Sequence, residues 1–326
     1  VGYGHLKRSF NIREKFKLKN FKVDITLFSN DRKKLNKNYL HYVSDKNIIK
    51  YCKNFNFASY KYIFFDLSHE SFKNHSSFNY FKNYLCKYKN KIILIDSYDK
   101  NSLRLFLKYR ILLIPYFFNY KLIEREKNCT YLLGPKFFIF NKELDYLRKK
   151  IFPKKFENVC VSLGGSDYKN LSYKILNSLT KIETLKSIKI IIGPYFNKKN
   201  ILNIKKIAKK NKKINLVFNP NNVYKIFQKC DFAIILSGLT KYELLLINCI
   251  FININENLNQ SRNNYFFKKK NVCFNLDCSK ISSDLKSSLY NIIKNTNLTK
   301  KKYLTMKNLI DNKGFERVYR EIKSNI

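Results

Sequence analysis

The sequence has few of the features that mark metal sites, secretion or membrane insertion. Its eight cysteines are scattered without a C-x-x-C pair, and its four histidines are not at metal-ligand spacing, so we expect reduced core cysteines, no metal site and no cofactor. No apolar run reaches the roughly 18 to 20 residues of a membrane span and no signal peptide is visible, which predicts a cytoplasmic protein without a membrane span. Because the printed sequence begins inside a motif, we expect the first strand of the fold to precede it.

Acidic residues are also scarce, with 23 Asp and Glu against 65 Lys and Arg, which gives a net charge of +42. Such a balance is typical of proteins that bind nucleic acid or anionic membranes. However, the lysines occur in nearly every segment among Asn, Ile, Phe and Tyr, as a strong A/T bias in the coding sequence would produce. We therefore predict a solvated lysine surface, no specific nucleic-acid partner, and weak polyanion binding that salt removes.

Hydrophobic residues make up 45% of the 326 residues, enough to build two folded domains. Short apolar runs alternate with amphipathic charged stretches, which predicts buried parallel strands joined by crossover helices. We expect an α/β protein with two Rossmann-like domains, residues 1–145 and 146–326, that face each other across a cleft, as a monomer or weak oligomer. The expected strands are residues 23–28, 62–66, 91–96, 111–115 and 130–133, then 158–163, 188–192, 215–218, 231–236 and 250–254, and a helix over 311–322 closes the structure.

Only eight glycines are present, and their positions predict a ligand crevice. All except Gly314 lie just after an expected strand or just before an expected helix, namely Gly2, Gly4, Gly134, Gly164, Gly165, Gly193 and Gly238. In an open α/β sheet these loops line the crevice at the carboxyl ends of the strands, and the adjoining helix N-termini suit a diphosphate. Glycines are also common in turns that bind nothing, but the whole set favours a ligand site.

The first motif, Gly2-Tyr3-Gly4-His5-Leu6-Lys7-Arg8, leads directly into an amphipathic helix. We expect the glycines to turn the chain sharply and leave His5 in the first helical turn, where the helix dipole disfavours imidazolium. A neutral His5 can accept a proton from water, which suits a general base. A histidine that merely caps the helix is an equally good interpretation of this motif alone.

Two further motifs each combine a strand, a glycine turn and a helix. In Gly164-Gly165-Ser166-Asp167 the backbone amides can approach a phosphate, although Asp167 is better explained as a helix cap. In Gly238-Leu239-Thr240-Lys241-Tyr242-Glu243, the spacing of Thr240 and Glu243 predicts a capping box. Alternatively, Glu243 accepts both hydroxyls of a ribose.

These motifs, in this order, resemble the UDP-sugar hydrolases of pseudaminic acid biosynthesis and their spore-coat polysaccharide relatives, which are built like the bacterial glycosyltransferase that completes lipid II. The likeness runs nearly from end to end. It comprises the G-x-G-H-x-x-R start, Asp66, Asp96, Leu133-Gly134-Pro135, Gly164 to Asp167, Ile192-Gly193-Pro194, Thr240 to Glu243, Asn259-Gln260, and the closing segment Asp311 to Val318.

The resemblance implies hydrolysis of a UDP-linked 2,4-diacetamido-2,4,6-trideoxy sugar, the altropyranose derivative of that pathway, with His5 as the base and no metal. It also implies that the second domain holds UDP, with Glu243 on the ribose. The implied substrate and UDP contacts are Gly4, Arg8, Asp66, Gly164, Gly165, Ser166, Asp167, Gly238, Leu239, Thr240, Glu243, Asn259 and Gln260.

The sequence departs from the family around the sugar. Ser68 and His69 follow Asp66 where the family has an aromatic residue, and Asn141 and Ser97 replace an arginine and an acidic residue. Two alternatives to the hydrolase stay open: a glycosyltransferase of the same shape that uses a UDP-sugar, and a non-catalytic basic protein that binds nucleic acid.

Overall fold

The computed structural model describes residues 3–28, 40–44, 47–66, 76–95, 108–257, 260–261, 264–307 and 309–326. The chain forms two compact units. The first unit consists of Val1–Lys142 together with Asn312–Ile326, and the second of Glu143–Asp311. The chain therefore leaves the first unit once and returns to it at its end.

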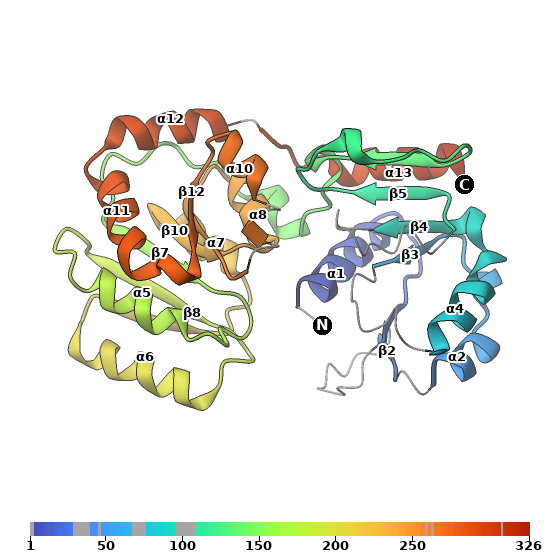
Figure 1. Cartoon of the computed structure of the whole chain (residues 1–326), viewed down its shortest axis with the longest axis horizontal. Coiled ribbons are helices and arrows are strands. Elements are labelled where there is room, and N and C mark those ends of the chain that lie inside the picture. The colour runs from blue at the N-terminus through green and yellow to red at the C-terminus, as the bar shows by residue number, and fades with distance from the viewer. Residues whose placement is uncertain are drawn as a thin grey trace. The chain divides into compact units, whose positions relative to one another are not determined.

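The first unit contains a two-stranded and a four-stranded sheet, both parallel (Figure 1). The smaller sheet pairs β1 (Ile25–Phe28) with β2 (Leu40–Val43). The larger has the order β3 (Ile63–Phe65), β4 (Ile92–Ile95), β5 (Ile111–Ile114) and β6 (Thr130–Leu133). The described helices are α1 (Tyr3–Lys17), α2 (Ile48–Asn54), α4 (Ser76–Cys86) and α13 (Gly314–Asn325), with 3-10 turns η2 (Phe57–Ser59), η3 (Lys89–Lys91), η5 (Tyr120–Leu122) and η6 (Pro135–Phe137).

The core of the first unit lies between its larger sheet and the helices α1 and α13. Strands β4 and β5 are runs of Ile and Leu that are buried along their whole length, as expected for inner parallel strands. Helix α13 places Phe315, Val318 and Ile322 on one face, at the spacing of an amphipathic stripe, and buries all three in this core. The ring of Phe16 from α1 meets the ring of Phe315 at 5.2 Å between centroids, nearly edge to face.

Gly314 marks a close contact at the start of α13. A Cβ atom on this residue would lie 2.1 Å from the backbone oxygen of Phe138, so no side chain fits without a backbone shift. The absence of a side chain therefore lets α13 dock against the segment that follows η6.

The second unit contains a six-stranded parallel sheet of order β12-β11-β10-β7-β8-β9. The chain builds it outward in one direction through β7, β8 and β9, and then outward in the other through β10, β11 and β12. This is the doubly wound Rossmann order, with its topological switch point between β7 and β10. The strands are β7 (Asn158–Ser162), β8 (Ser187–Ile192), β9 (Ile214–Phe218), β10 (Phe232–Leu236), β11 (Ile250–Asn255) and β12 (Phe274–Asp277).

Helices connect these strands, and α5 contacts both α6 and α11 (Figure 1). Asparagine side chains start several of them by accepting backbone N–H bonds: Asn197 for α6, Asn222 for α7 and Asn295 for α12. The described helices of this unit are α5 (Leu171–Leu179), α6 (Lys198–Lys210), α7 (Val223–Gln228), α8 (Thr240–Leu246), α10 (Tyr265–Lys269), α11 (Ile281–Ile293) and α12 (Thr296–Met306), with the 3-10 turn η8 (Cys278–Lys280).

The observed elements agree with the fold class expected from the sequence, since every expected strand corresponds to a strand of the structure. Strands β2 and β12 were not expected. The expected boundary after residue 145 falls within η7 (Lys142–Tyr146), where the units divide after Lys142. The closing helix begins at Gly314 rather than at residue 311, and it belongs to the first unit, whereas we expected it with the second domain.

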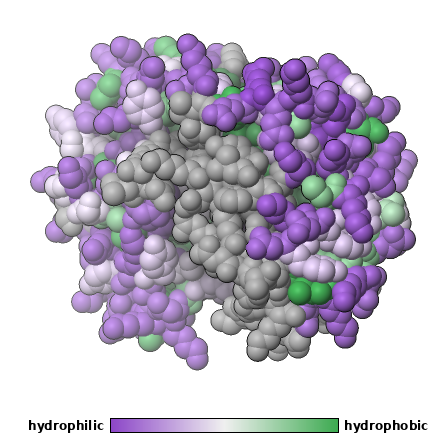
Figure 2. Space-filling view, turned by 45° about the vertical axis from the view of Figure 1, so that its right-hand side comes forward, coloured by the Kyte–Doolittle hydropathy of each residue, from purple (hydrophilic) through white to green (hydrophobic). Residues whose placement is uncertain are grey.

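The described surface is largely hydrophilic on the face drawn in Figure 2, and hydrophobic residues are scattered over it. Within the described ranges, no helix is both long and apolar enough to cross a membrane. The described ranges also contain no cluster of three or more His, Cys, Asp or Glu residues placed to hold a metal ion.

Candidate functional site

The first unit brings His5 and Arg8 of the G-x-G-H-x-x-R motif together with Asp66, which lies at the end of strand β3. Asp66 comes directly after β3, and His5 and Arg8 lie one turn apart on α1. Nδ1 of His5 is 2.6 Å from Oδ1 of Asp66, while Nε of Arg8 donates to Oδ2 at 2.6 Å and Nη2 of Arg8 donates to Oδ1. Asp66 thus holds the imidazole through one oxygen and the guanidinium through both.

Two groups contact Nδ1 of His5, since Oδ1 of Asp66 lies 2.6 Å and Nη2 of Arg8 lies 3.0 Å from it. A carboxylate oxygen can only accept, so the shorter contact is a hydrogen bond when Nδ1 carries the proton and Nε2 carries the lone pair. A carboxylate that orients an imidazole in this way also stabilises the imidazolium that forms when Nε2 takes a proton. The side chain of His5 is 30% exposed, whereas those of Arg8 and Asp66 are 11% and 8% exposed. Solvent therefore reaches the imidazole more than its partners.

The charge of Arg8 keeps Asp66 ionised. Burial by itself would raise the pKa of Asp66, but the Arg8 charge and the hydrogen bonds from His5 and Arg8 outweigh burial and lower that pKa below its usual value. Arg8 also lies over the ring of Tyr116, 5.6 Å from its centroid. Asp66 therefore positions both His5 and Arg8, and the substrate contacts expected of Arg8 and Asp66 stay predictions.

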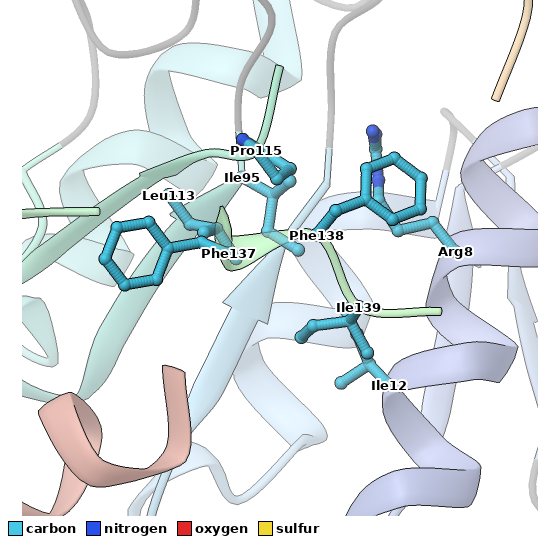
Figure 3. A pocket seen from close by; sticks show the side chains of 8 residues that line it. All are labelled: Arg8, Ile12, Ile95, Leu113, Pro115, Phe137, Phe138 and Ile139. Carbon is cyan, nitrogen blue, oxygen red and sulfur yellow. The ribbon is translucent and has the colours of Figure 1, made fainter. Parts of the chain in front are cut away.

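A small apolar pocket adjoins Arg8 (Figure 3). Arg8 and Ile12 reach it from α1, Ile95 from β4, and Leu113 from β5. It is completed by Pro115, Phe137, Phe138 and Ile139. Because the carboxyl ends of β4 and β5 open into it, the pocket lies at the same edge of the sheet as Asp66.

In the second unit, the expected phosphate turn lies at the switch point. Gly164 to Asp167 follow β7, and Ser237 to Leu239 follow β10, its neighbour in the sheet. A Cβ atom on Gly193, after β8, would lie 2.6 Å from the backbone oxygens of both Gly164 and Gly165, so this loop approaches the turn only because Gly193 has no side chain. Gly164, Gly165 and Ser166 are at least partly exposed.

Asp167 acts as a helix cap. It is 2% exposed, and its Oδ1 and Oδ2 accept the backbone N–H bonds of Leu171 and Ser172 at 2.8 and 2.9 Å. Burial raises the pKa of this carboxyl, although the hydrogen bonds oppose it. The structural explanation of Asp167 therefore accounts for both of its oxygens.

The capping box expected from Thr240 and Glu243 is wrong. Helix α8 has Leu239 as its N-cap and begins at Thr240, which places Glu243 one position too far along the helix for that motif. Glu243 is 1% exposed, and its Oε1 accepts a hydrogen bond of 2.9 Å from the hydroxyl of Tyr224. No local sequence pattern selects Tyr224, because its partner lies 19 positions away.

Other expected site residues have different surroundings. Gly4 is exposed in the first turn of α1. Oε1 of Gln260 accepts the backbone N–H of Glu256 at 2.8 Å, and its Nε2 donates to the Glu256 carboxylate at 3.3 Å. Gly2, Ser68, His69, Asp96, Ser97 and Asn259 lie outside the described residues.

A polar network that the sequence did not reveal lies beside the β10 turn. Nζ of Lys241 donates to Oδ1 of Asn264 at 2.6 Å, and Nδ2 of Asn264 donates to Ser237 and Asn255. Asn255 in turn donates to Asp277 at 3.0 Å across the β11–β12 pair. We call Ser237, Lys241, Asn255 and Asn264 the Lys241 cluster.

Comparisons with known proteins establish the fold. No family model matches the chain. A stretch of 134 residues is 29% identical to an uncharacterised protein of Methanocaldococcus jannaschii, covering 40% of this chain and only 28% of that relative. Among solved structures, MurG of Acinetobacter baumannii is similar with a TM-score of 0.68 at 10% identity, over 99% of this chain and 97% of that chain.

Two further solved structures are similar over 99% of this chain. A putative UDP-N-acetylglucosamine 2-epimerase from Listeria monocytogenes has a TM-score of 0.66 at 11% identity and is covered over 94% of its length. A glycosyltransferase from Rickettsia africae has a TM-score of 0.53 at 13% identity and is covered over 96%. The chain therefore has the glycosyltransferase-B fold, with two Rossmann-like parallel-sheet domains.

Proposed function

We propose that this protein is an enzyme that hydrolyses a UDP-linked sugar, with His5 as the general base. The observation that carries the proposal is the 2.6 Å contact between Nδ1 of His5 and Oδ1 of Asp66, at the carboxyl edge of a parallel sheet. An imidazole oriented by a buried carboxylate is an arrangement that suits general-base catalysis.

The reaction needs one proton acceptor. Nε2 of His5 takes a proton from water as the water oxygen forms a bond to the anomeric carbon. The bond from that carbon to the diphosphate oxygen breaks, and UDP leaves with the bonding electrons. Asp66 stabilises the imidazolium, and Arg8 fixes Asp66, after which the imidazolium returns its proton to solvent.

The second unit supports a nucleotide site. Its switch point lies between β7 and β10, and in doubly wound sheets ligands bind at that point outside the carboxyl ends of the strands. The turns at Gly164 to Ser166 and Gly238 to Thr240 follow these two strands, and their backbone amides, apart from that of Gly238, which donates to Leu236, are available for a diphosphate on this proposal. On this proposal Glu243 accepts the ribose hydroxyls, with its carboxylate held by Tyr224. Leu239, Asn259 and Gln260 complete the expected contacts.

We propose that the sugar is the 2,4-diacetamido-2,4,6-trideoxy sugar of pseudaminic-type biosynthesis. The support for this choice is the order of the sequence motifs from Gly2 to Val318, which resembles the order in that family of hydrolases. A glycosyltransferase that uses a UDP-sugar is the second candidate, because MurG of Acinetobacter baumannii and the Rickettsia africae glycosyltransferase have the same fold. The two functions differ in the acceptor, which is water for the hydrolase.

UDP release without an acceptor distinguishes these functions. We expect steady turnover of the UDP-linked sugar by the wild-type protein, and a loss of at least about a hundredfold in His5→Asn and Asp66→Asn. Asp24→Asn is the matched control, since Asp24 accepts a 2.7 Å bond from Tyr60 in the same unit and has no part in the proposed site. Release only after an acceptor is added would favour the transferase, and normal turnover by His5→Asn would remove His5 from the mechanism.

A further inference from the structure

Lys241 is a buried cation in the second unit. It is 6% exposed, and its Nζ lies 2.6 Å from Oδ1 of Asn264, 3.4 Å from Oγ of Ser237 and 4.9 Å from the ring centroid of Phe267. Among the described residues no carboxylate forms an ion pair with it. An amide oxygen and an aromatic face stabilise an ammonium group only in part, so the buried charge is left without a counter-charge.

The hydroxyl hydrogen of Ser237 also lacks an acceptor among the described residues. Its Oγ accepts hydrogen bonds from both Lys241 and Asn264, which occupy its two lone pairs. Its own hydrogen can then only donate, yet within the described part of the chain it has no acceptor. A half-buried donor with a cation directly behind it suits an anionic oxygen.

The space beside Ser237 is open. Gly238 is exposed, and among the described residues other than its two chain neighbours no atom lies within 4 Å of the position that a Cβ atom would take there. Ser237 and Gly238 directly follow β10, at the switch point of the sheet. An anionic group can therefore approach over Gly238 and reach the Ser237 hydroxyl.

We propose that Ser237 and Lys241 form an anion site that binds a phosphate group of the nucleoside diphosphate, with the Ser237 hydroxyl donating to a phosphate oxygen and Lys241 supplying the counter-charge. The inference rests on the proposed function for the identity of the nucleotide, but the site itself takes any diphosphate. Lys241 thereby becomes a determinant of phosphate affinity rather than a residue of the core.

A second buried lysine provides the matched control. Lys302 is 8% exposed, donates to Asn271 and to the backbone oxygen of Cys273, and lies over the ring of Phe274. These partners precede or begin β12, so Lys302 lies at the amino edge of the sheet, opposite to the switch point. Lys302→Met removes the same charge from the same unit at a place where no phosphate is expected.

The experiment measures dissociation constants of UDP, uridine and inorganic pyrophosphate for the wild-type protein, Lys241→Met, Ser237→Ala and Lys302→Met. Salt at about 0.3 M screens the exposed lysines. We expect Lys241→Met to raise the dissociation constants of UDP and pyrophosphate by roughly tenfold or more, and Ser237→Ala to raise them by a smaller factor. The dissociation constant of uridine should not change in either variant. In Lys302→Met the dissociation constants of all three ligands should stay at their wild-type values. Circular dichroism confirms that each variant is folded.

Equal weakening of UDP and uridine in Lys241→Met would show a structural role and overturn the inference. Unchanged pyrophosphate binding in both Lys241→Met and Ser237→Ala would overturn it as well, as would absence of pyrophosphate binding to the wild-type protein. Failure of UDP to bind more tightly than pyrophosphate counts instead against the proposed function, because the anion site would then be present without a nucleoside site.

Discussion

The hydroxyl of Tyr224 donates a 2.9 Å hydrogen bond to Oε1 of Glu243, and the two residues are 3% and 1% exposed. Burial, together with the charge of Glu243, raises the pKa of Tyr224, so the tyrosine remains a protonated donor wherever the fold persists. The bond fixes one oxygen of a carboxylate that the sequence places at the start of α8.

Tyr224→Phe should destabilise the protein by about 1 to 3 kcal/mol, because a buried carboxylate oxygen loses its donor. If Glu243 binds ribose, the variant should also bind UDP and 2′-deoxy-UDP with more similar affinities than the wild-type protein does. Urea denaturation and calorimetry measure the two effects. Tyr303→Phe is the control, since Tyr303 is 7% exposed and donates to the backbone oxygen of Lys150 at 2.9 Å. If both Tyr224→Phe and Tyr303→Phe prefer UDP over 2′-deoxy-UDP as strongly as the wild-type protein does, Tyr224 has no part in ribose binding.

Gly193→Ala should cost about 2 kcal/mol or more of folding free energy, because its Cβ atom would meet two backbone oxygens that cannot rotate away. Gly238→Ala is the comparison, and its stability should stay within about 0.5 kcal/mol of wild type, because in the described part of the chain no atom beyond its two neighbours lies within 4 Å of its Cβ position. Thermal denaturation of both variants is the measurement. Similar melting temperatures for the two variants would mean that the loops after β7 and β8 can separate freely.

Asp66 should make the free energy of unfolding depend on pH in the acidic range. Its pKa in the folded protein lies below the unfolded value, so its contribution is complete above the unfolded pKa and is lost as the pH falls through the folded one. The difference in unfolding free energy between wild type and Asp66→Asn should therefore shrink as the pH falls below about 4.

Asp167 has a raised pKa, so acidification should increase the stability of wild type relative to Asp167→Asn. Urea denaturation across this range checks both signs, and a constant difference for Asp66→Asn would contradict the ion pair with Arg8.

Lys241 should lower the stability of the ligand-free protein at neutral pH. Burial lowers the pKa of Lys241 to about 8, whereas a lysine in an unfolded chain titrates near 10.4. Between these values the unfolded state holds the additional proton, so the free energy of unfolding should rise with pH. Lys241→Met should lack this rise and be more stable at pH 7 by roughly 1 to 3 kcal/mol. Parallel stability curves for the two proteins from pH 7 to about 10 would contradict a buried charged amine.

The strands were predictable where apolar runs are continuous, as in Ile92–Ile95 and Ile111–Ile114, because inner parallel strands are buried on both faces. Strand β12 was missed because Phe274–Asp277 alternates apolar and polar residues over only four positions. Its polar side chains are explained by the neighbouring strand, since Asn275 and Asp277 accept hydrogen bonds from Asn253 and Asn255. Such pairing becomes visible only when the register is known.

The candidate site was predictable in its local parts and not in its long-range contacts. The glycine turns and His5 follow from short motifs, because a turn and a helix start are set by adjacent residues. Asp66 lies 61 positions from His5, and was expected only through the family resemblance. Lys241 was not selected from the sequence, because its partner Asn264 lies 23 positions away. Local sequence patterns carry no information on which side chains converge from separate loops.

The return of α13 to the first unit affects the order in which the chain can fold. The second unit is one uninterrupted segment, so during synthesis it can complete its core while the end of the chain is still being made. Most of the first unit is synthesised earlier, but its core is complete only when the last residues of the chain supply Phe315, Val318 and Ile322. A ribosome that stops before Gly314 would therefore release a protein whose second unit is whole and whose first unit exposes an uncovered apolar sheet face, a form that chaperones and proteases recognise.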